Sequence, residues 1–430
     1  MSDSEREQFV PADGRIATID VLRGIAILGV IIIHLWQATT LELLRRGVYL
    51  ERARDAIGAG DATRAWGASW EAVFALGDYG VTAFMVLSGV SLTIAALRRR
   101  ESANIITHYR ARLPKLLIPY WVGWSLYILT IAVVAWYSTH ADGGTFHDRF
   151  ELIGRANWVT RTRAITGFLL VPRGMRLEWA VAPMPSLWFV LPMVQYYLMF
   201  PPLFIVLKRI GPVAFFIASA AISIGSTLWL VAYAGDSNSF HGYVWSNWAP
   251  FRIIEFAAGM SIGYVAYEWQ HVMLRLRSVA GVPLLIAVGT AAVIISALLD
   301  GRHEQWDTLA HPFAATGIAF LVLSAIVWQP RRIVSFAPIR LVAFVGVMSY
   351  AVLIVNDCMR IVNHYSLGQG WRYTDGWWFF IVVIYVPVGV ALAYPLASML
   401  GLLPKPARPA PALPATTTAT ASPSESAVGG

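Results

Sequence analysis

The chain has 430 residues, of which 57% are hydrophobic and only 13% charged, and its mean hydropathy is +0.58. This balance excludes an ordinary soluble domain and indicates a polytopic membrane protein. The single cysteine, Cys358, excludes an internal disulfide framework, a cysteine-rich metal site and a thiol pair. The formal net charge of +8 does not indicate nucleic acid as a partner, because lysine and arginine cluster at the ends of apolar segments.

The two ends of the chain differ from its middle. Residues 1–15 mix acids and bases, unlike the basic start of a cleaved signal peptide, so we expect a cytoplasmic N-terminal segment before an uncleaved first span. Residues 405–430 are rich in Pro, Ala, Thr and Ser and have little to bury, which predicts a disordered cytoplasmic tail. Residues 16–404 are expected to form one membrane domain.

Ten apolar stretches are long enough to cross a bilayer, since about 20 residues span a hydrocarbon core of roughly 30 Å. Lysine and arginine gather in the short loops of one face, led by residues 98–115, and this face should be cytoplasmic. Two longer outer loops, 38–78 and 138–185, also carry arginines and are expected to be partly structured external elements. We therefore predict an all-α polytopic protein of the cell membrane, the inner membrane in a bacterium, with about ten transmembrane helices and both termini cytoplasmic. The expected spans are 18–37, 79–97, 116–137, 187–207, 212–234, 250–268, 279–298, 310–328, 338–360 and 377–403.

The first span carries Asp20, Arg23 and His34. Arg23 and His34 are 11 residues apart, which is about three helical turns or roughly 16 Å, so the three side chains share one face of the helix. An ionisable group inside a span usually faces the bundle interior or a wet cavity, where a neutral imidazole can take a proton from a hydroxyl. Two blander alternatives stay open: the acid and the arginine only anchor the helix, and the histidine only bonds a neighbouring helix.

The same acid and base spacing recurs in two later spans. Arg252 and Glu255 lie three residues apart, as do Asp357 and Arg360. Anchoring at the membrane surface explains Arg360 well, because it lies at the end of its span. Glu255 lies inside an apolar run, so anchoring explains it less well.

Several sequence motifs follow one another along residues 15–400. They are RIATIDVLRGIAILGVIIIHLW, a Phe-x-Val-Leu-Ser-Gly segment at 84–89, HYRARLPKLLIPYWVGW, SLWFVLPMVQYYLMFPPL, RIIEFAAGMSIGY and VGVMSYAVLIVN. In this order they resemble the membrane-bound acyltransferase family 3, whose members move acyl groups, often acetyl, from cytoplasmic acyl-CoA to hydroxyl acceptors. The resemblance implies that His34 is the catalytic base and Arg23 its essential companion. With Asp20 on the same face, they form the predicted catalytic set.

The resemblance places the family's paired-arginine element, which is thought to engage the phosphates of CoA, on Arg112 and Lys115. The lysine is a departure, because it keeps a charge for phosphate but loses the bidentate fork of arginine. A second departure is Asn356, where many members have a histidine. Positive-inside anchoring is the alternative for the basic loop. The predicted substrate- and CoA-binding residues are Arg112, Lys115, Arg110, Glu255, Arg252 and Ser88.

The function expected from these features is O-acyl transfer, with acetyl as the acyl group, from acyl-CoA to a carbohydrate, glycolipid or hydroxylated metabolite. The expected partners are the bilayer, acyl-CoA and that acceptor, without metal or nucleic acid. A transporter of a sugar or lipid-linked glycan is the alternative from another class, because His, Glu and Arg inside ten spans also suit a proton-coupled carrier. No internal repeat supports the carrier. Related multispan acetyltransferase or glucan-modifying families are a rival within the enzyme class.

Overall fold

A computed structural model describes residues 16–40, 52, 54–62, 75–99, 105–156, 185–234, 248–278, 280–299, 304–329, 336–366 and 380–403. The predicted N-terminal segment, the predicted tail and large parts of the two long outer loops lie outside the described residues. All regular elements in the described ranges are helices, as predicted. They are α2 (Ala17–Thr40), η1 (Leu76–Asp78), α5 (Tyr79–Arg98), α6 (Ile105–Asp142), α7 (Phe146–Ala156), η3 (Pro185–Leu187), α9 (Val190–Ile210), α10 (Pro212–Ala234), α12 (Ala249–Glu268), α13 (Gln270–Leu276), α14 (Gly281–Leu299), α15 (Glu304–Trp328), α17 (Ala337–Val347), α18 (Ser349–Ser366), η5 (Phe380–Tyr385) and α20 (Val386–Met399).

Seven helices of the described chain are long and apolar enough to cross a membrane, or eight if the bent pair α17 and α18 counts as one span. This confirms a polytopic all-α membrane protein. The other two predicted spans correspond to α12 and to the short apolar helix at Val383–Met399. The number ten and the side on which each terminus lies stay predictions.

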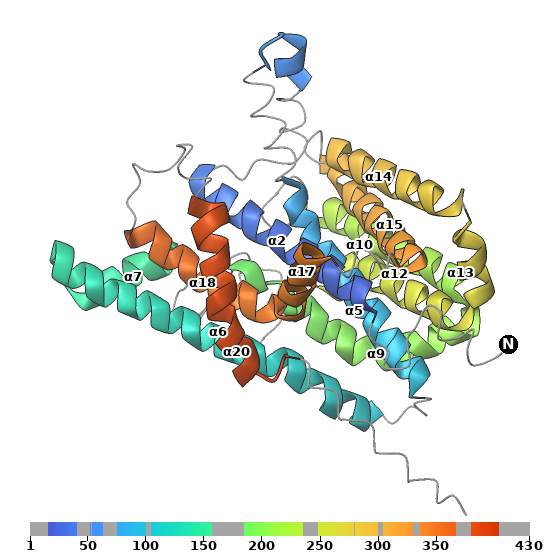
Figure 1. The fold of residues 1–430 in the computed structure, drawn as a ribbon, viewed down its shortest axis with the longest axis horizontal. Coiled ribbons are helices and arrows are strands. Elements are labelled where there is room, and N and C mark those ends of the chain that lie inside the picture. Colours follow the sequence, from blue (N-terminus) through green and yellow to red (C-terminus); the bar gives the residue numbers. More distant parts are fainter. Residues whose placement is uncertain are drawn as a thin grey trace, which may run out of the picture.

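The bundle has a central group of helices between two flanks (Figure 1). Helices α14 and α15 pack side by side on one flank, and α6 with α7 lies along the opposite one. Helices α2, α5 and α12 lie between them, with α5 in contact with both α2 and α12. Charged residues on these central helices therefore have protein neighbours.

Helix α12 is the most enclosed of these helices, with 15 of its 20 residues buried. It lies very close to α5, because a Cβ atom on Gly259 would stand 1.9 Å from the carbonyl oxygen of Val86, and one on Gly89 would stand 2.3 Å from that of Phe256. Only glycine allows two helix backbones to approach this closely. Arg252 and Glu255, two charged residues of α12, therefore lie inside protein and not against lipid.

Residues 338–360, predicted as one continuous span, form two helices that meet at a bend of 78°. The first of them, α17, packs on the start of α2 through two glycines: a Cβ on Gly24 would lie 2.0 Å from the oxygen of Val342, and one on Gly346 would lie 1.9 Å from that of Asp20. An apolar pattern does not show such a bend, because the two helices together are apolar enough to read as one span. Beyond the bend, α18 packs on α6, α20 and α2.

Helix α6 is much longer than the predicted span 116–137, since it runs for 38 residues. Its first turns take in Arg110, Arg112 and Lys115, which were expected in a loop. Two prolines, Pro114 and Pro119, lie inside the helix without ending it. The predicted cytoplasmic loop is therefore partly a rigid helix that holds its basic residues at fixed positions.

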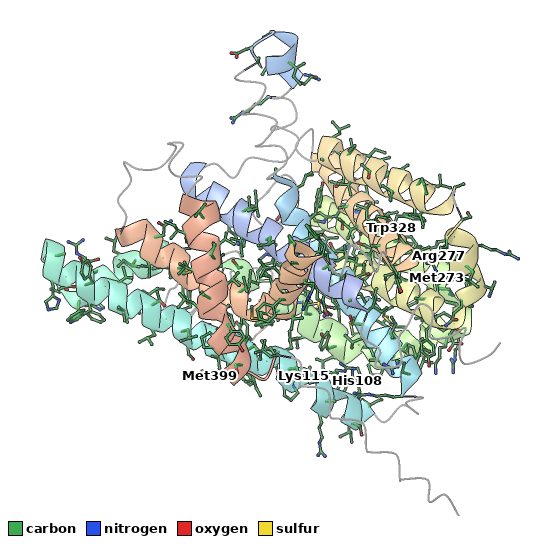
Figure 2. All side chains as sticks on the ribbon, viewed as in Figure 1. His108, Lys115, Met273, Arg277, Trp328 and Met399 are labelled. Carbon is green, nitrogen blue, oxygen red and sulfur yellow. The ribbon has the colours of Figure 1, made fainter. Side chains whose placement is uncertain are left out.

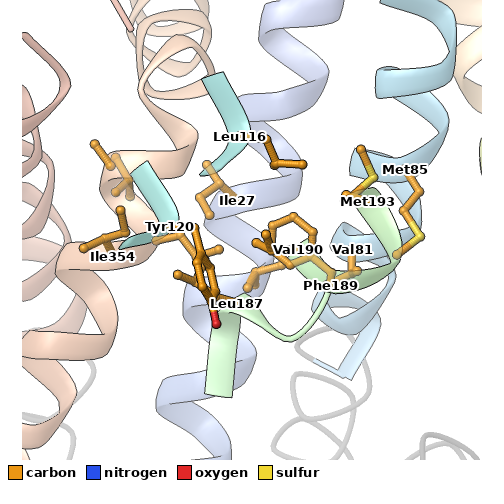
Figure 3. Close-up of a cluster of buried hydrophobic side chains, with 14 of the residues drawn as sticks. Ile27, Val81, Met85, Leu116, Tyr120, Leu187, Phe189, Val190, Met193 and Ile354 are labelled. Atoms are coloured by element: carbon orange, nitrogen blue, oxygen red, sulfur yellow. The ribbon is translucent and has the colours of Figure 1, made fainter. Parts of the chain in front are cut away.

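A hydrophobic cluster joins α2, α5, α6, α9 and α18 (Figure 3). Figure 3 shows side chains from these helices gathered around the turn that leads from η3 into α9. This buried cluster lies in the middle of this part of the bundle, and several of its members also line a cavity described below. The labelled members are Ile27, Val81, Met85, Leu116, Tyr120, Leu187, Phe189, Val190, Met193 and Ile354.

Candidate active site

A strongly basic cavity of about 610 Å³ opens beside the first turns of α2. We call it the arginine cavity. Its walls come from α2, the last turns of α5 and the first turns of α6. Its polar lining residues are Asp20, Arg23, Ser91, Arg98, Arg99 and Arg112. Four arginines and one acid among the described residues make this the natural place for a polyanionic ligand.

Arg23 lies on the wall of this cavity with its side chain 29% exposed. Its Nη2 donates to Ser91 Oγ at 3.0 Å, and its Nη1 lies 3.7 Å from Asp20 Oδ1. Ser91 is itself oriented, because its hydroxyl donates to the carbonyl of Leu87 one turn earlier. The guanidinium is therefore aimed along α5, and the loose contact with Asp20 leaves donors facing the cavity.

A second, narrower cavity of about 190 Å³ adjoins the first, and Arg23 and Arg112 line both. We call it the tyrosine cavity. It brings together predicted residues from three helices, and Figure 2 shows one of them, Lys115, on the first part of α6 near His108. Arg110 is exposed and is not among the lining residues. The full lining is Arg23, Phe84, Ser88, Arg112, Lys115, Leu116, Phe189, Met193, Tyr197, Ser349, Tyr350 and Leu353.

His34 belongs to a buried chain of hydrogen bonds near the other end of α2. Its Nδ1 lies 2.8 Å from Ser186 Oγ, and that hydroxyl donates to Asp357 Oδ1 at 2.5 Å. The backbone N–H of Ser186 donates to Asp357 Oδ2 at 3.1 Å. Ser186 is 1% exposed and Asp357 0%, so the carboxylate is held by both groups away from water.

This chain determines which ring nitrogen of His34 carries the proton. The Ser186 hydroxyl has a single proton and gives it to Asp357, so its oxygen must accept from His34 Nδ1–H. A neutral imidazole protonated at Nδ1 has its lone pair at Nε2. Among the residues that the structure describes, none bonds Nε2. In this arrangement the lone pair of the neutral ring is at Nε2.

Three chain segments connect the tyrosine cavity to His34. Helix α2 lines the cavity at Arg23 and carries His34 three turns later. The η3 turn bonds His34 through Ser186, and Phe189 just after it lines the cavity. Helix α18 lines it at Leu353 and places Asp357 one turn farther on. The same three segments thus contribute residues both to the tyrosine cavity and to the hydrogen-bonded chain at His34.

Arg252 and Glu255, also predicted to bind substrate or CoA, lie elsewhere. Arg252 Nη2 donates to Glu255 Oε1 at 2.6 Å, and its Nε lies 3.1 and 3.0 Å from the two carboxylate oxygens. Thr82 donates to Glu255 Oε1 at 3.0 Å, and His311 Nδ1 lies 3.8 Å from it. The guanidinium also covers the ring of Trp188 at 4.9 Å. Neither residue lines the two cavities, and their charges neutralise each other inside the bundle.

Sequence reasoning did not find Ser186, Arg98 or Arg99. Ser186 is the first residue of one of the motifs quoted above, but it follows a proline, and because serine is common at such turns nothing singled it out. Arg98 and Arg99 were read only as part of a basic loop. Asn356, where the resemblance leads one to expect a histidine, is 2% exposed. Its backbone oxygen accepts a hydrogen bond from the Tyr385 hydroxyl at 3.2 Å. A signal that could have found Arg98 and Arg99 is their place about two turns after Ser91.

Within the described ranges, no group of three His, Cys, Asp or Glu side chains is placed to hold a metal ion. That no metal takes part stays a prediction. The roles of the predicted site residues likewise stay predictions, although Asp20, Arg23, Ser88, Arg112 and Lys115 lie around two adjoining cavities.

Comparisons with known proteins identify one family. Neither the curated proteins nor the solved structures give a match to this chain. One family model, described as an acyltransferase domain, matches residues 16–397. This range takes in both cavities and all three members of the hydrogen-bonded chain at His34. Because the match covers most of the 430 residues, the chain belongs to the acyltransferase 3 family.

Proposed function

We propose that the protein transfers an acyl group, acetyl in the first instance, from cytoplasmic acyl-CoA to a hydroxyl of a carbohydrate, glycolipid or hydroxylated metabolite, with His34 as the general base. The observation that carries the proposal is the hydrogen-bonded chain from His34 through Ser186 to Asp357. A base needs a free lone pair and a fixed orientation, and this chain supports the proposal because it holds the ring at Nδ1 and leaves the lone pair at Nε2.

In the proposed reaction, His34 Nε2 takes the proton of the acceptor hydroxyl while the hydroxyl oxygen attacks the carbonyl carbon of the thioester. The carbon–sulfur bond then breaks, and the proton passes from His34 to the leaving thiolate. The products are an ester and free CoA. Asp357 stabilises the protonated ring through Ser186 during the transfer. A positioned base of this kind contributes about 10²- to 10⁴-fold to the rate.

The donor would approach from the arginine cavity. Arg23 and Arg112 line both cavities, so a ligand whose anionic end sits among the arginines can extend its uncharged arm into the tyrosine cavity. Phe189 and Leu353, at the inner wall, belong to the segments that hold Ser186 and Asp357. The thioester would thus be directed toward His34.

The experiment supplies purified protein with radiolabelled acetyl-CoA and a lipid and glycan extract of cells that lack the gene. The proposal expects label to move from CoA into a component of the extract. If the protein instead drives a sugar or lipid-linked glycan into sealed vesicles without CoA, and no label moves, it is a carrier and the proposal is wrong.

A matched pair of serine variants tests whether the hydrogen-bonded chain through Ser186 orients His34 for catalysis. Ser186→Ala removes the bond that orients His34, and misplacement of a catalytic group costs up to about 100-fold. We expect kcat to fall while KM for acetyl-CoA stays the same. Ser219→Ala is the control, since that buried hydroxyl only bonds the carbonyl of Phe215 in its own helix. Equal kcat values for the two variants would contradict the orienting role of Ser186.

A further inference from the structure

A third cavity, of about 610 Å³, lies between α6, α18 and the segment formed by η5 and α20. We call it the lateral groove. Figure 1 shows these helices next to one another, and α18 packs on both α6 and α20. Its rim has apolar side chains that are between 43% and 52% exposed, namely Val362, Ile384, Val388 and Leu392. In a bundle that crosses a membrane, an exposed apolar rim of this kind faces lipid.

Two asparagines at the groove have buried polar atoms without a hydrogen-bond partner among the described residues. One is Oδ1 of Asn363, which lines the groove. The other is Nδ2 of Asn356, whose backbone oxygen is bonded by the lining residue Tyr385. Buried polar groups in folded proteins are nearly always hydrogen-bonded. The two amides thus offer an acceptor and a donor to the hydroxyl groups of a ligand.

A row of polar side chains leads from the groove to the candidate base. Asp357, Arg360 and Asn363 follow one another at intervals of three residues on α18, so they form one ridge of that helix. The ridge begins at Asp357, which is bonded to Ser186 beside His34. It ends in the groove at Asn363. These six residues rise about 9 Å along the helix axis, so a head group at Asn363 lies less than two turns from Asp357.

We propose that the acceptor is a lipid whose hydrocarbon chain lies in the lateral groove and whose hydroxyl-bearing head group bonds Asn363. This rests on the proposed function, because it takes acyl transfer as the reaction. It narrows the acceptor to a glycolipid or another hydroxylated lipid, since a water-soluble sugar or metabolite has no chain for the groove. The lining residues differ from those of the arginine and tyrosine cavities, so both of these remain free for the donor.

The chemistry of the groove supports a lipid with a hydroxylated head. Its described lining residues are all uncharged and mostly apolar, which suits a hydrocarbon chain. Ordinary contact with the bilayer would also explain the apolar rim. It does not explain the Asn363 oxygen, because a lipid such as phosphatidylcholine has no hydrogen-bond donor for it.

The single cysteine of the chain, Cys358, lines the groove and can report its occupancy. Wild-type protein in phosphatidylcholine nanodiscs is treated with N-ethylmaleimide, and alkylation of Cys358 is followed by mass spectrometry. Octadecyl β-glucoside and methyl β-glucoside are the probes, because they share the sugar hydroxyls and differ in the chain. We expect the octadecyl compound to slow alkylation several-fold and the methyl compound to leave the rate unchanged. Equal rates with both probes would overturn the proposal.

The variant Asn363→Leu tests the contact with the head group. It keeps a side chain of similar size and removes the oxygen that would accept from a lipid hydroxyl. We expect octadecyl β-glucoside to protect Cys358 in this variant much less than in the wild type. Undiminished protection would contradict the role of Asn363.

A second pair of variants tests whether acyl transfer uses the groove. Val388→Trp fills it from a lining position that is 43% exposed. Val288→Trp is the control, because Val288 is 41% exposed on α14, at the opposite flank and outside the three cavities. The measurement is label moved from acetyl-CoA into the chloroform-soluble part of the cell extract. We expect Val388→Trp to lower it about tenfold or more, because tryptophan displaces several methylene groups of the chain. Equal labelling by the two variants would overturn the proposal.

The fate of the label separates this proposal from the proposed function. Label that moves only into water-soluble components overturns the lipid acceptor and leaves acyl transfer standing. If no component is labelled while octadecyl β-glucoside still protects Cys358 selectively, the groove binds lipid and acyl transfer is the part that fails.

Discussion

Arg23 and Arg252 each lie three residues from an acid, yet their surroundings are opposite. The Arg23 side chain is 29% exposed, stands 3.7 Å from Asp20 and lines two cavities. The Arg252 side chain is 3% exposed and makes a 2.6 Å contact with Glu255. An arginine whose donors are used inside the bundle stabilises the fold, whereas one on a cavity wall keeps donors for a ligand. Substitution of Arg252 should therefore lower the stability of the fold, whereas substitution of Arg23 should weaken the binding of a ligand.

The largest effect, on the stability of the protein, is expected when the buried ion pair of Arg252 and Glu255 is broken. Arg252→Ala leaves Glu255 as a buried charge without its main partner, and breaking such a pair costs about 3–5 kcal/mol. We expect a large drop in the unfolding temperature of the detergent-solubilised protein, measured by circular dichroism. Arg209→Ala is the control, because that arginine is exposed at the end of α9. Equal unfolding temperatures for the two variants would contradict a structural role for the pair.

Removal of both charges should restore most of this loss. Replacement of a buried ion pair by apolar residues of similar volume is often neutral or stabilising. The double variant Arg252→Met with Glu255→Leu should therefore unfold at a temperature near that of the wild type and retain acyl transfer. If it folds but has lost transfer, Arg252 or Glu255 has the substrate role that the sequence suggested.

An intermediate effect, on KM for acetyl-CoA, is expected when Arg23 is removed from the wall of the two cavities. Arg23→Ala should raise KM for acetyl-CoA by about 10- to 100-fold, because a hydrogen bond to a charged group contributes about 1.5–3 kcal/mol. The unfolding temperature should change little, since the side chain is partly exposed and its contact with Asp20 is loose. A lower unfolding temperature with unchanged KM would mean that Arg23 only anchors its helix.

The smallest effect is expected at Asp20. The pair with Arg23 is 3.7 Å apart and partly exposed, and such pairs contribute about 0.2–1 kcal/mol. Asp20→Asn removes the negative charge from the arginine cavity, so KM for acetyl-CoA should fall by at most a few-fold, with kcat unchanged. A large loss of kcat would instead place Asp20 in the catalytic set, as the sequence predicted.

The sequence alone could place residues along one face of one helix. Helical periodicity put Asp20, Arg23 and His34 on a common side of α2, and the structure places the first two in a single cavity. Periodicity acts within a helix, so it could not pair His34 with Ser186, which is 152 residues away. The bond from Ser186 to Asp357 spans 171 residues and depends equally on how the helices pack.

Hydropathy likewise could not show whether an apolar helix faces lipid or is enclosed by other helices. Helix α12 reads like a span, but its neighbours enclose it so that Arg252 and Glu255 can pair inside protein. The close approach of α5 depends on Gly89 and Gly259, whose small size carries no weight in a hydrophobic average. The same limit hid the 78° bend between α17 and α18.

The central claim is that His34, oriented by Ser186 and Asp357, is the base of the acyl transfer. The most direct measurement is kcat for transfer from acetyl-CoA by His34→Ala, with His140→Ala as control, because His140 is exposed and bonds only the Trp136 carbonyl of its own helix. We predict a kcat about 10²- to 10⁴-fold below that of the wild type for His34→Ala alone, with an unchanged unfolding temperature. Transfer by a folded His34→Ala protein at the rate of the control would contradict the claim.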